Sequence, residues 1–107
     1  MSTATANQDD RAGRIISQLV AHLVERLQPQ KIILFGSRAR GSARPGSDID
    51  LAVKGGNLPG FREERKLREE LDRLAGMYSV DLVFLEQSDE AFRAMVEETG
   101  KILYEEN

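Results

Sequence analysis

The sequence predicts an α/β protein of the α+β type, with one small mixed β-sheet of about three to four strands flanked by helices. Three observations predict this class. Apolar residues recur at helical spacing in three segments, short apolar runs of strand character separate these segments, and no repeat or linker divides the chain. A length of 107 residues also suits one domain with a modest core.

The first third of the chain contains one helix and one strand. Residues 1–10 are small and polar, so we expect a disordered N-terminus there and a single domain over residues 11–107. Residues 14–27 carry apolar side chains at three- and four-residue spacing, which predicts a helix with one buried face, and Pro29 ends it. The run KIILF, residues 31–35, predicts a short buried strand.

The middle of the chain contains a strand, a loop and a charged helix. In DIDLAVK, residues 48–54, apolar and polar positions alternate, which predicts a strand with one apolar and one polar face. The stretch GGNLPG, residues 55–60, is typical of a loop. Residues 61–75 are highly charged but carry leucines at helical spacing, which predicts a helix with a solvated side.

The last third adds another strand and another helix. In SVDLVFL, residues 79–85, Asp81 alternates with apolar neighbours, which predicts a third strand. Just before it, Met77 is expected to fill the core. Residues 89–98 predict the last helix, Gly100 caps it, and KILYEE closes the chain.

Composition and charge exclude several classes of protein. Hydrophobic residues make up 40% of the chain and charged residues 31%, as in ordinary globular proteins. No apolar run approaches the roughly 18 residues of a membrane span and the N-terminus lacks an export signal, so we expect a cytoplasmic protein without membrane contact. The absence of cysteine excludes disulfides and thiolate chemistry. A net charge of −3 and a pI near 5.2 argue against direct binding to nucleic acid.

The order of the elements brings polar residues together. Only about a dozen residues join the first two strands, so these strands are expected to pair antiparallel, with Gly36 and Ser37 beside Asp48. A full helix joins the second and third strands, as in a crossover between parallel strands. Asp81 would then face Asp48 and Asp50, whose side chains share one face because they are two residues apart. We therefore expect three carboxylates to meet beside a Gly-Ser turn.

Clustered carboxylates of this kind call for a cation. Like charges within about 4 to 6 Å raise one another's pKa, and Mg²⁺ prefers one or two carboxylates together with substrate phosphates. Paired Mg²⁺ ions stabilise the entering and leaving oxygens of a phosphoryl-type transfer. Gly36 would let the backbone approach a triphosphate closely, and Ser37 would donate a hydroxyl hydrogen bond. The pattern therefore predicts attack of a hydroxyl on the α-phosphate of a nucleotide.

A rival motif and simpler interpretations exist for the same residues. Gly36 and Gly41 have the spacing of a Walker A loop, but Ser42 and Ala43 stand where that motif needs Lys and then Ser or Thr. Each aspartate could also be a turn residue or the first residue of a strand. Strand interiors disfavour Asp, and two of the three aspartates are expected within strands, which favours the functional interpretation.

The spacing of these motifs carries a family resemblance. Gly36-Ser37, ten residues later an Asp-x-Asp pair, and then a single Asp81 on an apolar strand resemble the signature of the minimal nucleotidyltransferases in the DNA polymerase β-like superfamily. The resemblance covers nearly the whole chain, residues 14–104. It implies the nucleotidyltransferase fold, a small mixed sheet flanked by helices, which agrees with the order of elements derived above.

The resemblance implies a role for each matching residue. Asp48 and Asp50 match the pair that holds two Mg²⁺ ions. Asp81 matches the third carboxylate, which completes the metal site nearer the acceptor and helps to accept the proton of the hydroxyl. Gly36 and Ser37 match the turn that binds the triphosphate of the nucleotide. The resemblance implies that this nucleotide is ATP.

The arginines after this turn are less diagnostic. Arg38 and Arg40 are candidates to contact phosphate or a partner, although exposed arginines are often only soluble surface, and Arg44 is expected to be surface. Stand-alone members of the family resemble the antitoxin of a module whose toxin is a HEPN-domain ribonuclease. The resemblance therefore implies AMPylation, the transfer of AMP from ATP to a tyrosine hydroxyl of a HEPN-type toxin protein, which silences that toxin.

Two other functions fit the same residues. The chain could neutralise its partner as a non-catalytic, binding antitoxin. It could also be an antibiotic-type nucleotidyltransferase that modifies a small molecule. A single domain of this size has no residues left for an acceptor site, so we expect a hetero-oligomer with the partner or a homo-oligomer in which a neighbouring subunit completes the site.

Overall fold

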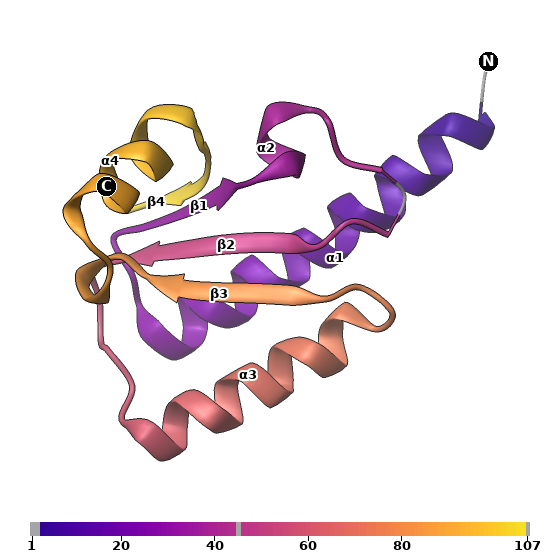
Figure 1. The fold of residues 1–107 in the computed structure, drawn as a ribbon. Helices are drawn as coiled ribbons and strands as arrows, with labels where there is room; N and C mark the ends of the chain where they lie inside the picture. The colour runs from indigo at the N-terminus through magenta and orange to yellow at the C-terminus, as the bar shows by residue number, and fades with distance from the viewer. Residues whose placement is uncertain (1–2, 45, 107) are drawn as a thin grey trace.

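A computed structural model describes residues 3–44 and 46–106, and of residues 3–10 the backbone alone. Its elements follow in the order α1 (Thr3–Leu27), β1 (Lys31–Phe35), α2 (Ser37–Arg40), β2 (Ile49–Lys54), α3 (Phe61–Ala75), β3 (Val80–Phe84), the 3₁₀ turn η1 (Leu85–Gln87), α4 (Glu90–Thr99) and β4 (Lys101–Glu105). Helices α1 and α3 pack against one face of the sheet and α4 against the other (Figure 1). The predicted α/β class with a small mixed sheet is confirmed.

The four strands form one sheet in the order β3-β2-β1-β4. The antiparallel pairing of β1 with β2 and the parallel pairing of β2 with β3, both predicted from connection lengths, are confirmed. The fourth strand comes from the KILYEE segment and pairs antiparallel with β1. In this register Phe35 lies opposite Asp50, and Asp50 lies beside Asp81.

Two apolar layers of different size cover the two faces of the sheet. The larger layer lies under α1 and α3, and β2 contributes Ile49, Leu51 and Val53 to it, all fully buried. The smaller layer lies under α4 and includes Ala52 of β2. Because side chains alternate along a strand, Asp50 projects from the same face as Ala52. The sheet therefore separates the main core from the polar residues of β2.

Helix α1 begins at Thr3, well before residue 14, where the apolar spacing predicts its start. Ala12 is already buried, and the stretch before it contains alanines and no proline, so nothing there interrupts the helix. Residues 3–10 are thus helical where we expected a disordered N-terminus, and residues 1 and 2 lie outside the described residues. The helix ends at Leu27, as Pro29 predicts.

Strand β4 is an edge strand with irregular pairing. It pairs with β1 alone, and the register between the two strands shifts between Ile32 and Ile33, as at a β-bulge. All five of its side chains are exposed or half-buried, and Ile102 is 51% exposed. The β4 edge of the sheet is therefore irregular.

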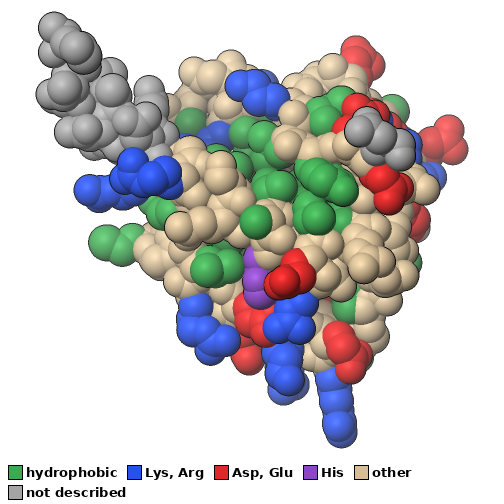
Figure 2. All heavy atoms as spheres, turned by 180° about the vertical axis from the view of Figure 1, so that it is seen from behind, with side chains coloured by type: hydrophobic (Ala, Val, Ile, Leu, Met, Phe, Trp, Pro, Cys, Tyr) green, Lys and Arg blue, Asp and Glu red, His purple; other side chains and the backbone are tan. Residues whose placement is uncertain are grey.

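Figure 2 shows hydrophobic side chains gathered on the face that α1 covers. A groove there is lined by the half-buried Ile16, Val20 and Val24 of α1 and by Leu103 and Tyr104 of β4. The apolar side chains of α1 form a stripe along one side of the helix. Within the described ranges, no helix is both long and apolar enough to cross a membrane. The groove lies on the sheet face opposite Asp50.

A polar bridge joins α1 to α3 at Glu70. The Glu70 carboxylate accepts a hydrogen bond from Arg26 Nη2 at 2.7 Å and lies 2.7 Å from Nε2 of His22. The hydrogen bond with His22, and then the charge of Arg26, hold the pKa of Glu70 below its ordinary value of 4.5, although partial burial acts in the opposite direction. A lowered carboxyl pKa stabilises the fold above pH 4.5, and this stability is lost as the pH falls through the lowered value.

We expect Glu70→Gln to lower the melting temperature at pH 7, because the neutral amide loses the charge-assisted bonds to α1. The difference from the wild type should shrink as the pH falls below 4.5, where the wild-type carboxylate becomes protonated as well. Thermal unfolding at a series of pH values measures this, with the exposed neighbour changed, Glu69→Gln, as the control. A difference independent of pH would show that the bridge does not stabilise through its charge.

Candidate active site

The turn after β1 brings its backbone against a carboxylate. Gly36 has φ 75° and ψ −154°, a conformation that is essentially restricted to glycine, and α2 starts immediately after it. A Cβ atom at this position would overlap the Oδ2 atom of Asp50. The sequence predicts that this glycine permits a close approach to a triphosphate, and in the structure it also permits a close approach to Asp50.

The three predicted aspartates lie at the same end of the sheet. Asp48 directly precedes β2, Asp50 is the second residue of β2, and Asp81 is the second residue of β3. Asp50 and Asp81 occupy paired positions of the parallel ladder. Asp48 and Asp81 are exposed, whereas Asp50 is half-buried. The structure thus places together the aspartates that the sequence predicts to meet.

Asp50 carries the electrostatic signature of a carboxylate cluster. Its pKa is raised above the ordinary value of 3.8, first by burial and then by the negative charges of Asp81 and Asp48. The positive charges of Arg38 and Arg40 act in the opposite direction. A cation near Asp50 would offset this repulsion, so the chemistry of the site fits a hard divalent ion.

The same carboxylates do not form a complete metal cage. Among the residues that the structure describes, no group of three or more His, Cys, Asp or Glu side chains is arranged to hold one metal ion. Mg²⁺ commonly takes only one or two carboxylates from a protein and further oxygens from substrate phosphates and water. The donor set therefore fits an ion that binds together with a nucleotide.

Arg38 and Arg40 differ in their surroundings, although the sequence predicts the same role, contact with a phosphate or a partner, for both. The Arg38 guanidinium donates to backbone carbonyls of Ser47 and Asp48 and lies over the ring of Tyr78, 5.3 Å from its centre. Arg40 is exposed, and its side chain makes no hydrogen bond or ion pair within the described residues. The sequence contains no signal for this difference, because Ser47 and Tyr78 approach Arg38 only in the folded chain.

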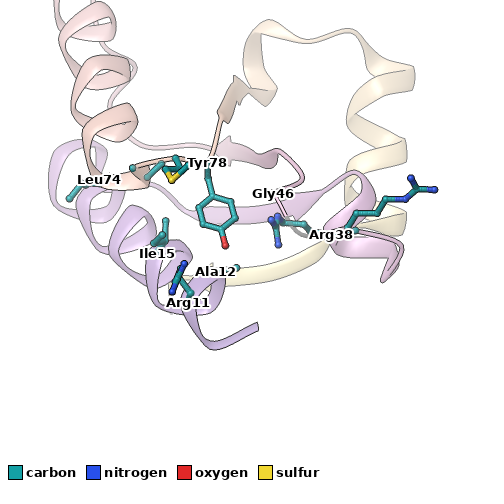
Figure 3. A pocket seen from close by; sticks show the side chains of 12 residues that line it. Arg11, Ala12, Ile15, Arg38, Gly46, Leu74 and Tyr78 are labelled. Atoms are coloured by element: carbon teal, nitrogen blue, oxygen red, sulfur yellow. The ribbon is translucent and has the colours of Figure 1, made fainter. Parts of the chain in front are cut away.

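A pocket of about 470 Å³ lies at the same end of the sheet. Figure 3 shows the ring of Tyr78 at its centre, with Arg38 on one side and Arg11, Ala12 and Ile15 of α1 on the other. Its walls come from the first half of α1, from α2 and the loop after it, and from the end of α3 and its connection to β3. Because these segments are far apart in the sequence, no local sequence pattern could reveal the pocket.

Met77 and Arg44 both line this pocket, and both are exposed to solvent. Met77, expected in the core, is 101% exposed, because it lies at the tip of the turn after α3 rather than on its apolar face. Arg44 is exposed, as expected, and it also lines the pocket. Its backbone N–H donates to Ser47 Oγ at 2.8 Å, which closes the turn before Asp48.

The sequence profile of the family described as "Polymerase beta, Nucleotidyltransferase" matches residues 17–107. The chain belongs to this nucleotidyltransferase family. The family resemblance predicted from the Gly-Ser turn and the three aspartates is therefore confirmed, and so is the nucleotidyltransferase fold.

Relatives of this nucleotidyltransferase include a protein adenylyltransferase. The protein adenylyltransferase MntA of Thermococcus cleftensis is 40% identical over 72 residues, which are 64% of this chain and 72% of that protein. A toxin–antitoxin crystal structure with AMP-PNP contains a similar chain, with a TM-score of 0.72 and 28% identity over 85% of this chain and 73% of the other.

A second solved complex is similar to the same nucleotidyltransferase. It contains a tri-AMPylated HEPN toxin of Shewanella oneidensis with an MNT antitoxin, and the similarity has a TM-score of 0.63 at 28% identity. It covers 92% of this chain and 73% of the matched chain. These identities and TM-scores indicate relatedness as well as a common fold.

Proposed function

We propose that this nucleotidyltransferase transfers AMP from ATP to a tyrosine hydroxyl of a HEPN-type toxin and acts as its antitoxin. The convergence of Asp48, Asp50 and Asp81 beside the Gly36 turn carries this proposal, because that arrangement suits phosphoryl-type transfer. The adenylyltransferase relative and the complexes with AMP-PNP and with a tri-AMPylated toxin support the choice of nucleotide and acceptor.

Each site residue has a defined role in the proposed reaction. Asp48 and Asp50 hold Mg²⁺, two ions by the family pattern, which supply positive charge to the phosphate oxygens when bound. Gly36 and Ser37 bind the triphosphate through the backbone and the hydroxyl group. Arg40, exposed beside this turn, contacts a phosphate. Asp81 completes the carboxylate set on the side of the acceptor.

The proposed transfer balances as a single displacement. The tyrosine oxygen forms a bond to the α-phosphorus of ATP, and the bond between the α-phosphorus and the bridging oxygen to the β-phosphate breaks. Pyrophosphate leaves with the electrons of that bond. The proton of the tyrosine hydroxyl passes to the Asp81 carboxylate, which is exposed and free to receive it from a bound partner.

The proposed acceptor site belongs largely to the partner. The described residues form one nucleotidyltransferase domain, and two of the three aspartates are open to solvent, so a second protein can reach them. A net charge of −3 suits a basic partner such as an RNA-cutting toxin. We place the reaction in the cytoplasm, where ATP and a reducing environment agree with a chain free of cysteine.

The proposal is tested by incubating the purified protein with labelled ATP, Mg²⁺ and its HEPN partner. We expect label on the toxin, and we expect it to disappear in the Asp48→Ala/Asp50→Ala double variant, which has lost the metal-binding pair. Asp72→Ala, which changes an exposed acid on α3, is the matched control and should label the toxin normally.

Other outcomes would identify the two remaining functions. Toxin that is silenced without label, equally by the wild type and the double variant, would show a non-catalytic binding antitoxin. Label that appears on antibiotics and never on the toxin would show a small-molecule nucleotidyltransferase.

A further inference from the structure

Three separate segments of the active site meet at the Arg38 side chain. Its Nη2 donates to the Ser47 carbonyl at 2.8 Å, and its Nε donates to the carbonyls of Ser47 and Asp48, both at 3.2 Å. The Cζ atom of its guanidinium group also lies over the Tyr78 ring, 5.3 Å from the ring centre. Arg38 itself belongs to α2, directly after the Gly-Ser turn. One side chain therefore links the turn after β1 to the segments that precede β2 and β3.

Both of these segments carry an aspartate of the site. Asp48 is one of the two residues whose carbonyl Arg38 contacts, and Tyr78 lies three residues before Asp81. The two segments are also joined directly, because Ile49 N donates to Ser79 O at 2.8 Å where the parallel ladder begins. A change at Arg38 would therefore reach Asp48 and Asp81 through short stretches of backbone.

The contacts of Arg38 occupy one edge of its guanidinium group, the edge formed by Nε and Nη2. Nε and Nη2 form one of the two forks that can take two oxygens of a carboxylate or phosphate, and here both nitrogens donate to backbone carbonyls. A phosphate could use this edge only after those bonds were broken. Arg40 has no such engagement within the described residues, so its whole guanidinium group is available to the nucleotide.

We propose that Arg38 is a positioning residue, which holds the segments bearing Asp48 and Asp81 in place and does not bind the nucleotide phosphates. This inference rests on the proposed nucleotidyl transfer for its effect on catalysis. Its structural part, the fastening of the two segments, is independent of which molecule accepts the nucleotide. Tyr78 acts with Arg38, because its ring lies within cation–π distance of the guanidinium group and both residues line the pocket.

Steady-state kinetics of the complex with the toxin separate positioning from phosphate binding. We expect Arg38→Gln to lower kcat about 10- to 100-fold with little change in the KM for ATP, because misplacing a catalytic group by about 1 Å has an effect of this size. Arg40→Gln, the matched control, should mainly raise the KM for ATP. The reverse pattern, a raised KM with unchanged kcat for Arg38→Gln, would overturn the proposal.

Conservative variants distinguish geometry from charge. Arg38→Lys keeps the positive charge near Asp50 but loses the planar fork, so it should retain the low kcat of Arg38→Gln. Tyr78→Phe keeps the ring and should retain a higher kcat than Tyr78→Leu. Tyr78→Leu removes the ring and should lower kcat, and its effect should not add to that of Arg38→Gln. Full rescue by lysine, or additive effects of the two changes, would contradict a shared positioning role.

Amide hydrogen exchange tests the fastening without any activity. We expect the Ile49 amide, which bonds across to Ser79, to exchange about tenfold faster in Arg38→Gln than in Arg40→Gln, because a charge-assisted hydrogen bond no longer closes the segment. Equal exchange in the two variants would refute the fastening. Faster exchange in Arg38→Gln, combined with no nucleotidyl transfer by any form including the wild type, would refute the proposed function and leave the fastening intact.

Discussion

Asp50→Asn is expected to abolish nucleotidyl transfer and, in the absence of metal, to raise the melting temperature of the protein. Losing a metal-binding carboxylate removes several kcal/mol of transition-state stabilisation, so we expect activity to fall about 10³-fold or more. The gain in stability has a separate cause. Burial, and then the charges of Asp81 and Asp48, raise the pKa of Asp50, so its ionised form destabilises the fold.

The pH dependence of this gain follows from the sign of the shift. A raised carboxyl pKa makes the folded state hold its proton more tightly, so the ionised group destabilises the fold at all pH values above the raised pKa. This penalty is present at neutral pH and fades as the pH falls through the raised pKa toward the ordinary value of 3.8. The difference in stability between Asp50→Asn and the wild type should therefore be largest near neutral pH and should shrink as the pH is lowered.

Thermal unfolding with and without Mg²⁺ and a non-hydrolysable ATP analogue measures both effects. Without ligands the asparagine variant should melt at the higher temperature, and with them the wild type should gain more, because only it keeps the full carboxylate set. Asp72→Asn, on the exposed side of α3, is the control and should change neither value. A metal-free asparagine variant that melts below the wild type would show that ionised Asp50 does not destabilise the fold.

Gly36→Ala is expected to damage both the fold and the activity. The new Cβ would have to occupy a backbone conformation with φ 75° and ψ −154°, and it would also overlap the Asp50 carboxylate. Strained backbone of this kind costs about 1 to 3 kcal/mol, so we expect the free energy of unfolding to drop by about that amount. Displacing Asp50 should lower kcat about 100-fold.

Gly41→Ala is the matched control for this substitution. Gly41 also has φ 75°, but with ψ 13° it lies in the ordinary left-handed region, and a Cβ atom there would meet no atom within 4 Å. It should therefore cost about 1 kcal/mol and leave kcat near the wild-type value. Denaturant unfolding and the transfer assay compare the two variants. Equal losses in both would mean that positive φ alone, and not the approach to Asp50, makes Gly36 necessary.

The arrangement of the aspartates could be predicted because it depends on backbone geometry alone. The alternation in DIDLAVK places Asp48 and Asp50 on one face, since successive side chains of a strand point in opposite directions. The full helix between β2 and β3 requires a crossover, which makes these strands parallel and brings Asp81 beside Asp50. Both deductions use spacing along the chain, which the sequence contains in full.

The features that could not be predicted depend on tertiary contacts of side chains. Arg38 and Arg40 belong to the same short helix. Only the folded loop shows that Arg38, and not Arg40, donates hydrogen bonds to the carbonyls of Ser47 and Asp48. Helix α1 begins at Thr3, earlier than the sequence predicts, because the apolar spacing that predicts the helix begins only at residue 14. The 470 Å³ pocket combines three distant segments, so it exists only once they meet.

The bulge in the pairing of β4 with β1 affects how readily two copies of this protein can associate through the β4 edge. In a regular strand Lys101 and Glu105 would share one face, but the shifted register sets Lys101 opposite Leu34 and Glu105 opposite Lys31, which point to opposite faces. A second copy laid antiparallel along this edge would find its charges and apolar residues on mismatched sides. The β4 edge of the sheet is thus a poor template for the addition of a strand from another molecule, which disfavours polymerisation through this edge.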